Sequence, residues 1–502
     1  MITAPSAGPS YEQALQALGE RGRFGVRLGL GRTRALLREL DHPERTVRGA
    51  LIAGTNGKGS VLALAESALR AAGYRVGSTP KPHLVTYRER ICLDGQPIGA
   101  DDFARLVGRV LDVADRVARR HGEPTEFELL TAVVFARFAE ARPDVALVEV
   151  GLGGRLDATH AWDGGVAVVT NVDLDHMDRL GDTVTKIARE KAAIIEHGDL
   201  AVTGARGDGL AVIRRRARRL AVPLTEVLPA PLLGWDRDTI EVDLPRLGPT
   251  RVGLRGRHQA SNVAIADATL DALESAGIAT VPDAARRAGY ATAAWPGRLE
   301  LLRIGDRDVL LDGAHNPAGA AALATALDDL RPFLERGPVT LVTASMTDKD
   351  VDGVIDALVG AAALAGATVV CTNLDVPRAM PAQDLAARWR AMRGGSPGAR
   401  RSGSPGASPG ASPGASPGAS PGASPGASPG ASPGATIVMP DPLAAVDLAL
   451  QGPGPVVVAG SLYLVGAARG HLVDDPSLRD PGPSPHDPDS DRDSDRDPDE
   501  DA

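Results

Sequence analysis

A glycine-rich loop between an apolar segment and a helical segment constrains the fold of this chain more than any other feature. Gly54-Thr-Asn-Gly-Lys-Gly-Ser60 follows Gly49–Ala53, a predicted buried strand, and precedes a predicted helix over 61–72. Glycines let backbone N–H groups turn toward phosphate oxygens at a helix N-terminus, and Lys58 supplies a cation for them. The pattern predicts a nucleotide-binding loop in a parallel α/β sheet. A structural glycine-rich turn is the alternative, because the match to the usual phosphate loop is imperfect.

The remaining apolar segments form two α/β units. The first contains candidate strands at 144–150 and 165–171, which end in polar residues, and helices over 11–40 and 183–196. We predict an N-terminal phosphate-loop ATPase domain over residues 1–295, with a parallel sheet, and a C-terminal Rossmann-like α/β domain over 296–473. The second unit has candidate strands at 308–312, 339–343, 367–371, 436–439 and 455–459, and helices at 318–330, 351–365 and 381–392.

Two segments have compositions that favour no packed structure. The insert at 396–435 contains eight tandem Ser-Pro-Gly-Ala units and interrupts the second domain, so we expect a flexible spacer. The tail at 474–502 holds twelve acids and three arginines, and we expect it to be disordered. Because the tail accounts for the net charge of −9, the body is nearly neutral. This balance indicates neither a nucleic-acid-binding stripe nor a basic membrane-facing patch.

Other features of composition indicate a cytoplasmic protein. No run of about 18 apolar residues occurs, and the N-terminus lacks a secretion signal, so we expect no membrane span. The two cysteines, Cys92 and Cys371, argue against a disulfide framework. Only five of the 55 basic residues are lysines, so a retained lysine can mark a position that arginine cannot serve.

Acidic and imidazole side chains follow the first-unit strands. Glu149 ends an apolar strand, where a buried carboxylate needs a partner such as Mg²⁺. His176 follows the next strand, with Asp173 and Asp175 beside it. A lone histidine is more often structural, but its place among acids at a strand end, near a phosphate loop, favours a functional role.

An ordered set of motifs resembles the folylpolyglutamate synthase / dihydrofolate synthase family of the Mur ligase superfamily. The phosphate loop is the first, and the set spans about residues 11–466 apart from the insert. Any one motif is weak, whereas the ordered set is specific. The others are Pro82-His-Leu-Val-Thr-Tyr-Arg-Glu-Arg-Ile91, Thr125-Glu-Phe-Glu128, Glu149-Val-Gly-Leu-Gly-Gly-Arg-Leu-Asp-Ala158, Leu174-Asp-His-Met-Asp-Arg-Leu-Gly181, Ile187-Ala-Arg-Glu-Lys191, Arg257-His-Gln-Ala-Ser-Asn262, Trp295-Pro-Gly-Arg-Leu-Glu300 and Asp312-Gly-Ala-His-Asn-Pro317.

The resemblance implies catalytic roles for Lys58, His176 and Lys191 and a site for two Mg²⁺ ions. Ser60 and Glu149 would bind one ion with the β- and γ-phosphates of ATP, and His176 would bind the second. Lys191 would carry a carbamate formed with CO₂, which converts a cation into an anionic metal ligand. An ordinary surface cation on a helix is the alternative for Lys191.

The resemblance also implies an ATP site between the two domains. Arg298 would reach the phosphates, Asn262 the adenine, and Asp312 and His315 the ribose and phosphate region. We expect these four residues on or beyond a hinge at Trp295. The remaining ATP-binding positions are those of the loop, Gly54, Thr55, Asn56, Gly57, Lys58, Gly59 and Ser60.

A third group of residues resembles the pterin side of the family's site. Its members are His83, Thr125, Phe127 and Asp157. Arg88 and Arg90 could pair with substrate carboxylates or serve only surface solubility. Lys81 departs from the family pattern, because Thr79-Pro-Lys-Pro-His replaces the usual Ser-Pro-His.

The implied activity is an ATP-dependent carboxylate–amine ligase. It would add L-glutamate to dihydropteroate, to the γ-carboxylate of tetrahydrofolates, or to both, through an acyl phosphate. The expected partners are these small molecules and ATP, with no nucleic acid or membrane, and the protein is expected to be a monomer. A Mur ligase acting on a cell-wall precursor and a non-catalytic nucleotide-binding switch are the alternatives.

Overall fold

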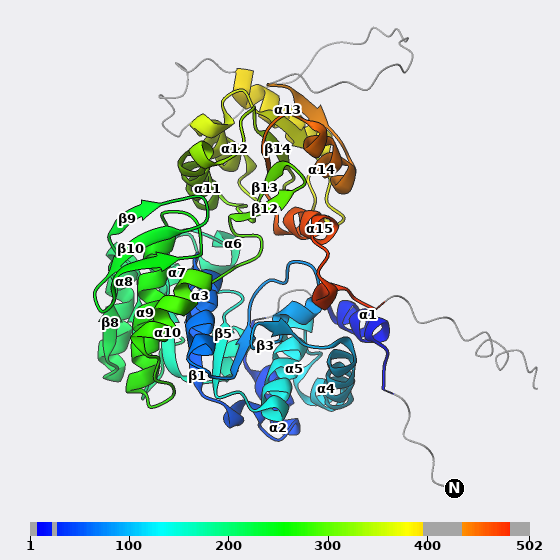
Figure 1. Cartoon of the computed structure of the whole chain (residues 1–502). Coiled ribbons are helices and arrows are strands. Elements are labelled where there is room, and N and C mark those ends of the chain that lie inside the picture. The colour runs from blue at the N-terminus through cyan, green and yellow to red at the C-terminus, as the bar shows by residue number, and fades with distance from the viewer. Residues whose placement is uncertain (1–7, 23–27, 395–433, 482–502) are drawn as a thin grey trace, which may run out of the picture.

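The computed structural model describes residues 8–22, 28–394 and 434–481 (Figure 1). Almost all of the predicted spacer at 396–435, and the tail from residue 482, lie outside the described residues. The part of the tail that is described, 474–481, contains a short 3₁₀ turn, Pro476–Leu478, and packs against the first unit. The prediction of disorder from residue 474 is therefore wrong for these residues, because Asp480 forms specific polar contacts.

An eight-stranded sheet organises the first unit. Its order is β4-β3-β2-β5-β1-β6-β7-β8, and all neighbours are parallel except β2–β3 and β3–β4. This confirms the predicted α/β class with a parallel sheet. The strands are β1 Gly49–Ala53, β2 Val76–Thr79, β3 Cys92–Leu93, β4 Gln96–Pro97, β5 Val145–Glu149, β6 Gly165–Val169, β7 Leu200–Thr203 and β8 Leu224–Glu226.

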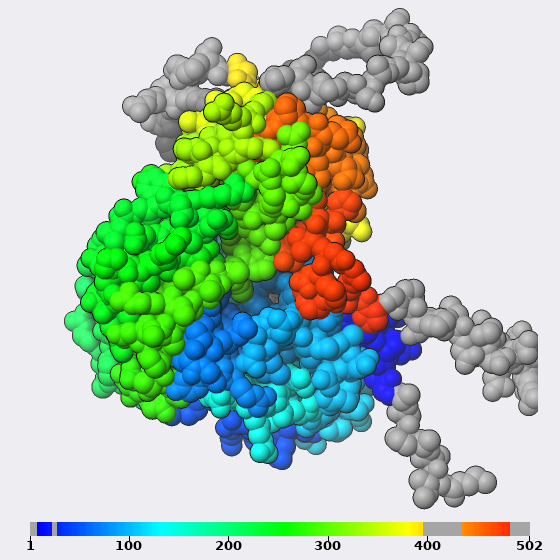
Figure 2. All heavy atoms as spheres, in the orientation of Figure 1, coloured from blue at the N-terminus to red at the C-terminus, as the bar shows by residue number. Residues whose placement is uncertain are grey.

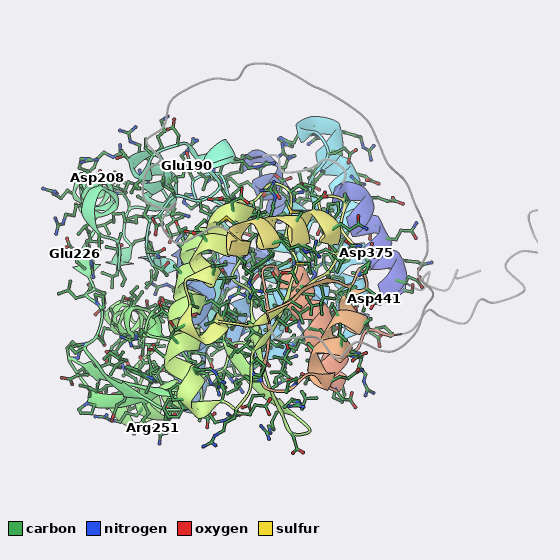
Figure 3. All side chains as sticks on the ribbon, turned by 90° about the horizontal axis from the view of Figure 1, so that it is seen from above. Glu190, Asp208, Glu226, Arg251, Asp375 and Asp441 are labelled. Carbon is green, nitrogen blue, oxygen red and sulfur yellow. The ribbon has the colours of Figure 1, made fainter. Side chains whose placement is uncertain are left out.

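Helices cover both faces of this sheet because its central strands are apolar on both sides. Alternate residues of β1 belong to different cores: Leu51 and Ala53 pack with α1, α2, α4 and α5, whereas Ala50 and Ile52 pack with α3, α9 and α10. Seen from above, charged side chains such as Asp208 and Glu226 lie at the periphery (Figure 3). The helices are α1 Tyr11–Gly22, α2 Gly31–Glu39, α3 Lys58–Ala71, α4 Ala100–His121, α5 Glu126–Ala141, α6 Met177–Leu180, α7 Val184–Ala192, α8 Gly207–Leu220, α9 Gln259–Ser275 and α10 Asp283–Thr292.

Three local predictions for this unit were wrong. The helix expected over 11–40 is described as two helices, Tyr11–Gly22 and Gly31–Glu39, and residues 28–30 before the second are not helical. The helix expected over 183–196 ends at Ala192, and Ile194 and Ile195 then turn into the core. An antiparallel sheet was missed altogether; its strands are β9 Leu232–Trp235, β10 Ile240–Leu244 and β11 Gly248–Val252.

A six-stranded sheet forms the second unit. Its order is β12-β13-β17-β14-β15-β16, with β12 antiparallel at one edge and the rest parallel. The helix expected over 351–365 ends at Val359, before Gly360. The elements are β12 Glu300–Ile304, β13 Arg307–Asp312, α11 Pro317–Leu330, β14 Thr340–Thr343, α12 Val351–Val359, β15 Thr368–Cys371, α13 Ala382–Gly394, β16 Thr436–Val438, α14 Pro442–Gln451, β17 Val456–Ala459 and α15 Leu462–Leu472.

The two units lie one above the other, and the surface is hollowed between them (Figure 2). The carboxyl ends of β1, β5 and β6 face the second unit, which places the phosphate loop at this hollow (Figure 1). None of the helices in the described part of the chain is long and apolar enough to cross a membrane.

Candidate active site

The phosphate loop joins β1 directly to α3, and its glycines are required by their surroundings. Gly57 precedes the first helical residue with a φ of 80°, and a Cβ there would lie 2.3 Å from Asn262 Oδ1. A Cβ on Gly54 would lie 1.8 Å from Thr170 Oγ1. Larger residues would therefore push the loop away from β6 and α9.

The end of β6 fixes the loop backbone. Asn171 Oδ1 accepts hydrogen bonds from the backbone N–H groups of Thr55 (3.1 Å) and Asn56 (2.8 Å). Thr170 Oγ1 donates to Asn56 O at 2.6 Å. The sequence prediction missed both as site residues, although their place at the polar end of a predicted strand was a usable signal.

Two lysine ammonium groups contact the base of the loop. Lys58 Nζ donates to Gly54 O and Thr55 O, both at 3.2 Å, and lies 4.0 Å from Glu149 Oε1. Lys191 Nζ, from α7, donates to Gly54 O at 2.8 Å. Because Lys191 is only 4% exposed, its interpretation as a surface helix cation is wrong. Burial, reinforced by the charge of Lys58, lowers the pKa of Lys191 to about 7.

Glu149 lies at the buried end of β5, and burial raises the pKa of its carboxyl against the opposing charge of Lys58. Its Oε2 accepts the backbone N–H of Lys81 at 2.9 Å. The Lys81 ammonium donates to Glu149 O at 2.6 Å and lies 5.0 Å from the centre of the Phe127 ring. Burial lowers the pKa of Lys81 to about 8. The unusual lysine of the sequence therefore lies inside the site.

His176 lines the same cavity as Glu149 and lies at the start of α6, with a φ of 49°. Its Nε2 is 3.8 Å from Asp175 Oδ2, and burial lowers its pKa. Asp173 and Asp175 line the same cavity. Among the residues that the structure describes, no group of three or more His, Cys, Asp and Glu side chains is gathered as metal ligands.

The second unit contributes Arg298, Asp312 and His315. Asp312 Oδ2 accepts the N–H of Leu299 and Oδ1 that of Ala314, both at 2.9 Å. Burial lowers the pKa of the Arg298 guanidinium, and the nearby charges of Asp312 and Glu149 oppose this shift. His315 Nδ1 lies 2.8 Å from Gly313 O, which favours the tautomer with the proton on Nδ1.

Asn262 belongs to the first unit. It lies on α9, whose apolar residues pack with β1 and α3, so the prediction of four residues on or beyond the hinge is wrong for this one. Its Nδ2 donates to Gln259 Oε1 at 2.8 Å, and Gln259 Nε2 lies 3.4 Å from Ser60 Oγ. Gln259 was missed, although it stands inside a motif that was recognised.

One cavity of about 630 Å³ collects most of the predicted residues. Its wall combines the phosphate loop and strand ends of the first unit with Arg298, Asp312 and His315 of the second. A volume of this size suits a nucleotide. The predicted residues in its lining are Thr55, Asn56, Gly57, Lys58, Gly59, Ser60, Phe127, Glu149, His176, Asn262, Arg298, Asp312 and His315.

The predicted pterin-side residues are only partly brought together. Thr125, Phe127 and Asp157 line a neighbouring cavity of about 320 Å³, and Phe127 borders both cavities. His83 lines neither; its Nδ1 accepts a 2.8 Å hydrogen bond from Arg90 Nε. Arg90 itself lines the larger cavity.

Arg88 has a role that neither sequence interpretation anticipated. Its side chain is buried and contacts the C-terminal segment through Asp480 Oδ1 (3.1 Å) and Arg479 O (2.8 Å). It is therefore neither a surface solubility residue nor open to a substrate carboxylate.

The fold and site define a class of protein. A Mur ligase middle domain matches residues 52–222, and the glutamate ligase domain of Mur ligases matches residues 297–403. With a phosphate loop facing a second α/β unit across a nucleotide-sized cavity, the chain is an ATP-dependent ligase of the Mur type.

Comparison with similar proteins shows which family of Mur-type ligases this chain belongs to. The chain is 36% identical over 390 residues to a dihydrofolate synthase/folylpolyglutamate synthase of Bacillus subtilis, covering 75% of this chain and 88% of that protein. It is 37% identical over 388 residues to a protein of the same name from Mycobacterium tuberculosis, covering 71% and 76%. The chain belongs to the dihydrofolate synthase/folylpolyglutamate synthase family. These matches favour the folate branch over a cell-wall ligase and over a non-catalytic switch.

Solved structures agree over nearly the whole chain. A folylpolyglutamate synthase of Mycobacterium tuberculosis, in complex with ADP and AMPPCP, superposes with a TM-score of 0.75 at 29% identity, covering 92% of this chain and 100% of that one. FolC of E. coli, in complex with DHPP and ADP, gives a TM-score of 0.73 at 27% identity, covering 93% and 99%. The nucleotides in these relatives are consistent with the use of ATP.

Proposed function

We propose that this ligase joins L-glutamate both to dihydropteroate and to the γ-carboxylate of tetrahydrofolates, with ATP in the cavity between the units. One observation carries the proposal: the phosphate loop, Glu149 and His176 share a cavity with Arg298, Asp312 and His315 of the other unit. The names of the Bacillus and Mycobacterium relatives, which combine the two activities, support the choice of substrates.

The proposed chemistry proceeds through an acyl phosphate. A folate carboxylate oxygen attacks the γ-phosphorus of ATP, the bond to the β-phosphate oxygen breaks, and ADP leaves. The amine of L-glutamate then attacks the acyl carbon, loses a proton, and expels phosphate. The loop N–H groups and Lys58 would hold the phosphates, and Arg298, half-buried in the cavity wall, would approach them from the second unit.

The residues present fit the two Mg²⁺ ions that the family implies. Glu149 is a buried carboxylate at the cavity wall, and the Ser60 hydroxyl and His176 imidazole line the same cavity. The Glu149 carboxylate and the Ser60 hydroxyl are oxygen ligands, which Mg²⁺ prefers, and His176 would offer an imidazole nitrogen. Ser60 and Glu149 would hold one ion and His176 the other, and the bound ions would neutralise charge on the phosphoryl oxygens.

For Lys191 we propose a carbamate that serves the second ion. A buried primary amine next to Lys58 supports this, because carbamate formation needs a neutral amine and both burial and the neighbouring cation favour one. A brace for the loop is the competing role, since Nζ donates to Gly54 O. The two roles differ by two charge units at the metal side of the site.

The remaining assignments are proposals of the same kind. Thr125, Phe127 and Asp157 would receive the pterin in the smaller cavity, which Phe127 connects to the nucleotide cavity. We propose domain limits of 1–295 and 296–473, a monomeric state and a cytoplasmic location.

The test is a product analysis of the purified full-length protein with ATP, Mg²⁺ and L-glutamate. Dihydropteroate should give dihydrofolate, and tetrahydrofolate should gain glutamate residues, each with one ADP per bond formed. Conversion of only one acceptor would restrict the proposal to that activity, and conversion of neither would overturn it.

A further inference from the structure

The chain returns to the first unit after its last helix. α15 belongs to the second unit, and the segment that follows it, 473–481, runs down to the region of α1 (Figure 1). A 3₁₀ turn, Pro476–Leu478, lies in the middle of this segment. Residues 473–481 are called the strap below.

Asp480 anchors the strap to the loop at 82–91. Its Oδ1 accepts hydrogen bonds from Thr86 Oγ1 (2.6 Å) and Arg88 Nε (3.1 Å). Arg88 donates further to Arg479 O at 2.8 Å and, from its other terminal nitrogen, to Ile98 O at 3.2 Å. The carboxylate is thus held by a buried guanidinium, a charge-assisted contact stronger than one between neutral groups.

The same loop is also held by α15. A Cβ on Gly466 would lie 1.9 Å from Leu84 O, so this helix touches the loop backbone. Gly297, at the connection between the units, lies beside Val465 of α15 and Leu84: a Cβ on it would lie 3.0 Å from Val465 Cγ1 and 3.1 Å from Leu84 Cδ2. The end of the second unit therefore clamps the loop from one side while the strap holds it at Thr86 and Arg88.

The loop 82–91, which the strap holds, forms part of the wall of the nucleotide cavity. Pro82 and Arg90 lie at the two ends of the loop, and both line the nucleotide cavity. Arg90 also bonds to His83. Three strap residues, Asp475, Ser477 and Leu478, line a further cavity of about 340 Å³, which shares Lys81, Pro82 and Arg298 with the nucleotide cavity.

We propose that Asp480 is a positioning residue for the acceptor side of the reaction. Through Arg88 and Thr86 it fixes the loop 82–91, and the loop fixes Arg90 in the wall of the nucleotide cavity, which Phe127 connects to the proposed pterin cavity. The inference rests on the proposed folate activity. It assigns a role in that activity to Asp480, which lies outside all the sequence motifs that define the site. Loss of the carboxylate should loosen the acceptor side while leaving the phosphate loop intact.

Steady-state kinetics of the full-length protein tests this. Asp480→Ala should raise KM for the folate acceptor about tenfold, the effect of losing roughly 1.4 kcal/mol of positioning energy, and leave KM for ATP within about twofold. Asp480→Asn keeps an oxygen that can accept hydrogen bonds but loses the charge, so its KM for the folate acceptor should lie between those of the wild type and Asp480→Ala. Asp447→Ala is the matched control, because it removes an exposed carboxylate paired with His471 at 2.8 Å within the second unit.

Hydrogen exchange without substrates gives an independent readout. Asp480→Ala should accelerate exchange in 82–91 and leave the loop at 54–60 unchanged, relative to Asp447→Ala. Equal KM values and equal exchange in the two variants would overturn the inference. So would a uniform rise in both KM values with a lowered Tm, which indicates general destabilisation. If the wild type converts no folate acceptor, the proposed function fails. The exchange result would still show whether Asp480 holds the loop 82–91 in place.

Discussion

Three of the five lysines of the chain contact backbone carbonyls at the ends of β1 and β5. Lys58 and Lys191 both donate to Gly54 O, and Lys81 donates to Glu149 O nearby. Each carries a compact primary amine on a flexible stem, whereas arginine would present a planar guanidinium with a different set of donors. At the scale of the residue, the site therefore gathers three lysine amines around the ends of β1 and β5.

Lys58→Ala should lower ligase turnover at least about a hundredfold, because the phosphates lose their fixed point charge. The fold should persist, since Asn171 still holds the loop backbone through Thr55 and Asn56. ADP release and thermal unfolding would be measured beside Lys186→Ala, which removes an exposed lysine paired with Asp182. Near-wild-type turnover of the Lys58 variant would rule out the phosphate-loop assignment.

Lys191→Arg keeps a cation that can reach Gly54 O but cannot form a carbamate. If the carbamate is needed, turnover should fall at least about tenfold, as expected for loss of a metal ligand or its support. Acetate should partly restore Lys191→Ala by supplying a carboxylate, and bicarbonate should not. Full activity of Lys191→Arg, with normal Mg²⁺ dependence, would leave Lys191 as a brace for the loop.

Sequence patterns located the site residues that are tied to strand ends and glycine-rich turns, because local chain geometry alone places them. They could not place Arg88 and Asp480, which lie almost four hundred positions apart in the sequence and meet only through tertiary packing. Gln259 was missed because an uncharged amide inside a motif carries no signal until its neighbour, Ser60, is known.

At the scale of the element, α3 has two functions. Its N-terminus presents the phosphate loop, and its body carries Glu66, which is buried against β2 and accepts a 3.1 Å hydrogen bond from Ser78 Oγ. Burial raises the pKa of Glu66 to about 7. The folded protein therefore holds a proton on this carboxyl that the unfolded chain has already lost above pH 4.5.

Glu66→Gln should remove a pH dependence of stability. Between pH 4.5 and about 7 the folded wild type binds more protons than the unfolded chain, so its free energy of unfolding falls as pH rises. The variant has no carboxyl to ionise at this position. Its free energy of unfolding at pH 8 should therefore exceed that of the wild type by up to about 3 kcal/mol. Urea unfolding at pH 5 and pH 8, with the exposed Glu241→Gln as control, measures it. A constant difference between wild type and Glu66→Gln at the two pH values would contradict the prediction.

The central parallel strands β1, β5 and β6 were predicted because each is a continuous apolar run that ends in polar residues, whereas the shorter parallel strands β2 and β7 were missed. The sheet of β9 to β11 was not, since its strands are half exposed and β9 lacks a clear alternation of apolar and polar side chains. Helix ends were misplaced where glycine interrupts an apolar pattern, as at Gly360, since the pattern continues beyond the break.

At the scale of the whole molecule, ATP would lie between two units that are covalently joined near Trp295 and held together by α15 and the strap. Such an arrangement allows closure to complete the site and exclude water. The repeat at 404–435 is inserted between α13 and β16, and neither of these two elements lines the cavity.

Removing the repeat should leave Tm and turnover within about twofold of wild type. Arg393 Nη1 lies 3.3 Å from Gly434 O, so the two chain ends are close enough for a short Gly/Ser linker. The entropy of loop closure changes slowly with length, which limits the effect on stability. A larger loss of activity at unchanged Tm would assign the repeat a functional role.

Transfer of ¹⁸O tests the central claim most directly. With both oxygens of the acceptor carboxylate labelled, attack on the γ-phosphorus followed by attack of the glutamate amine on carbon leaves one carboxylate oxygen on the phosphate. The account predicts one ¹⁸O in each inorganic phosphate, one in the new amide, and ADP as the nucleotide product. Unlabelled phosphate, or AMP and pyrophosphate in place of ADP, would contradict it.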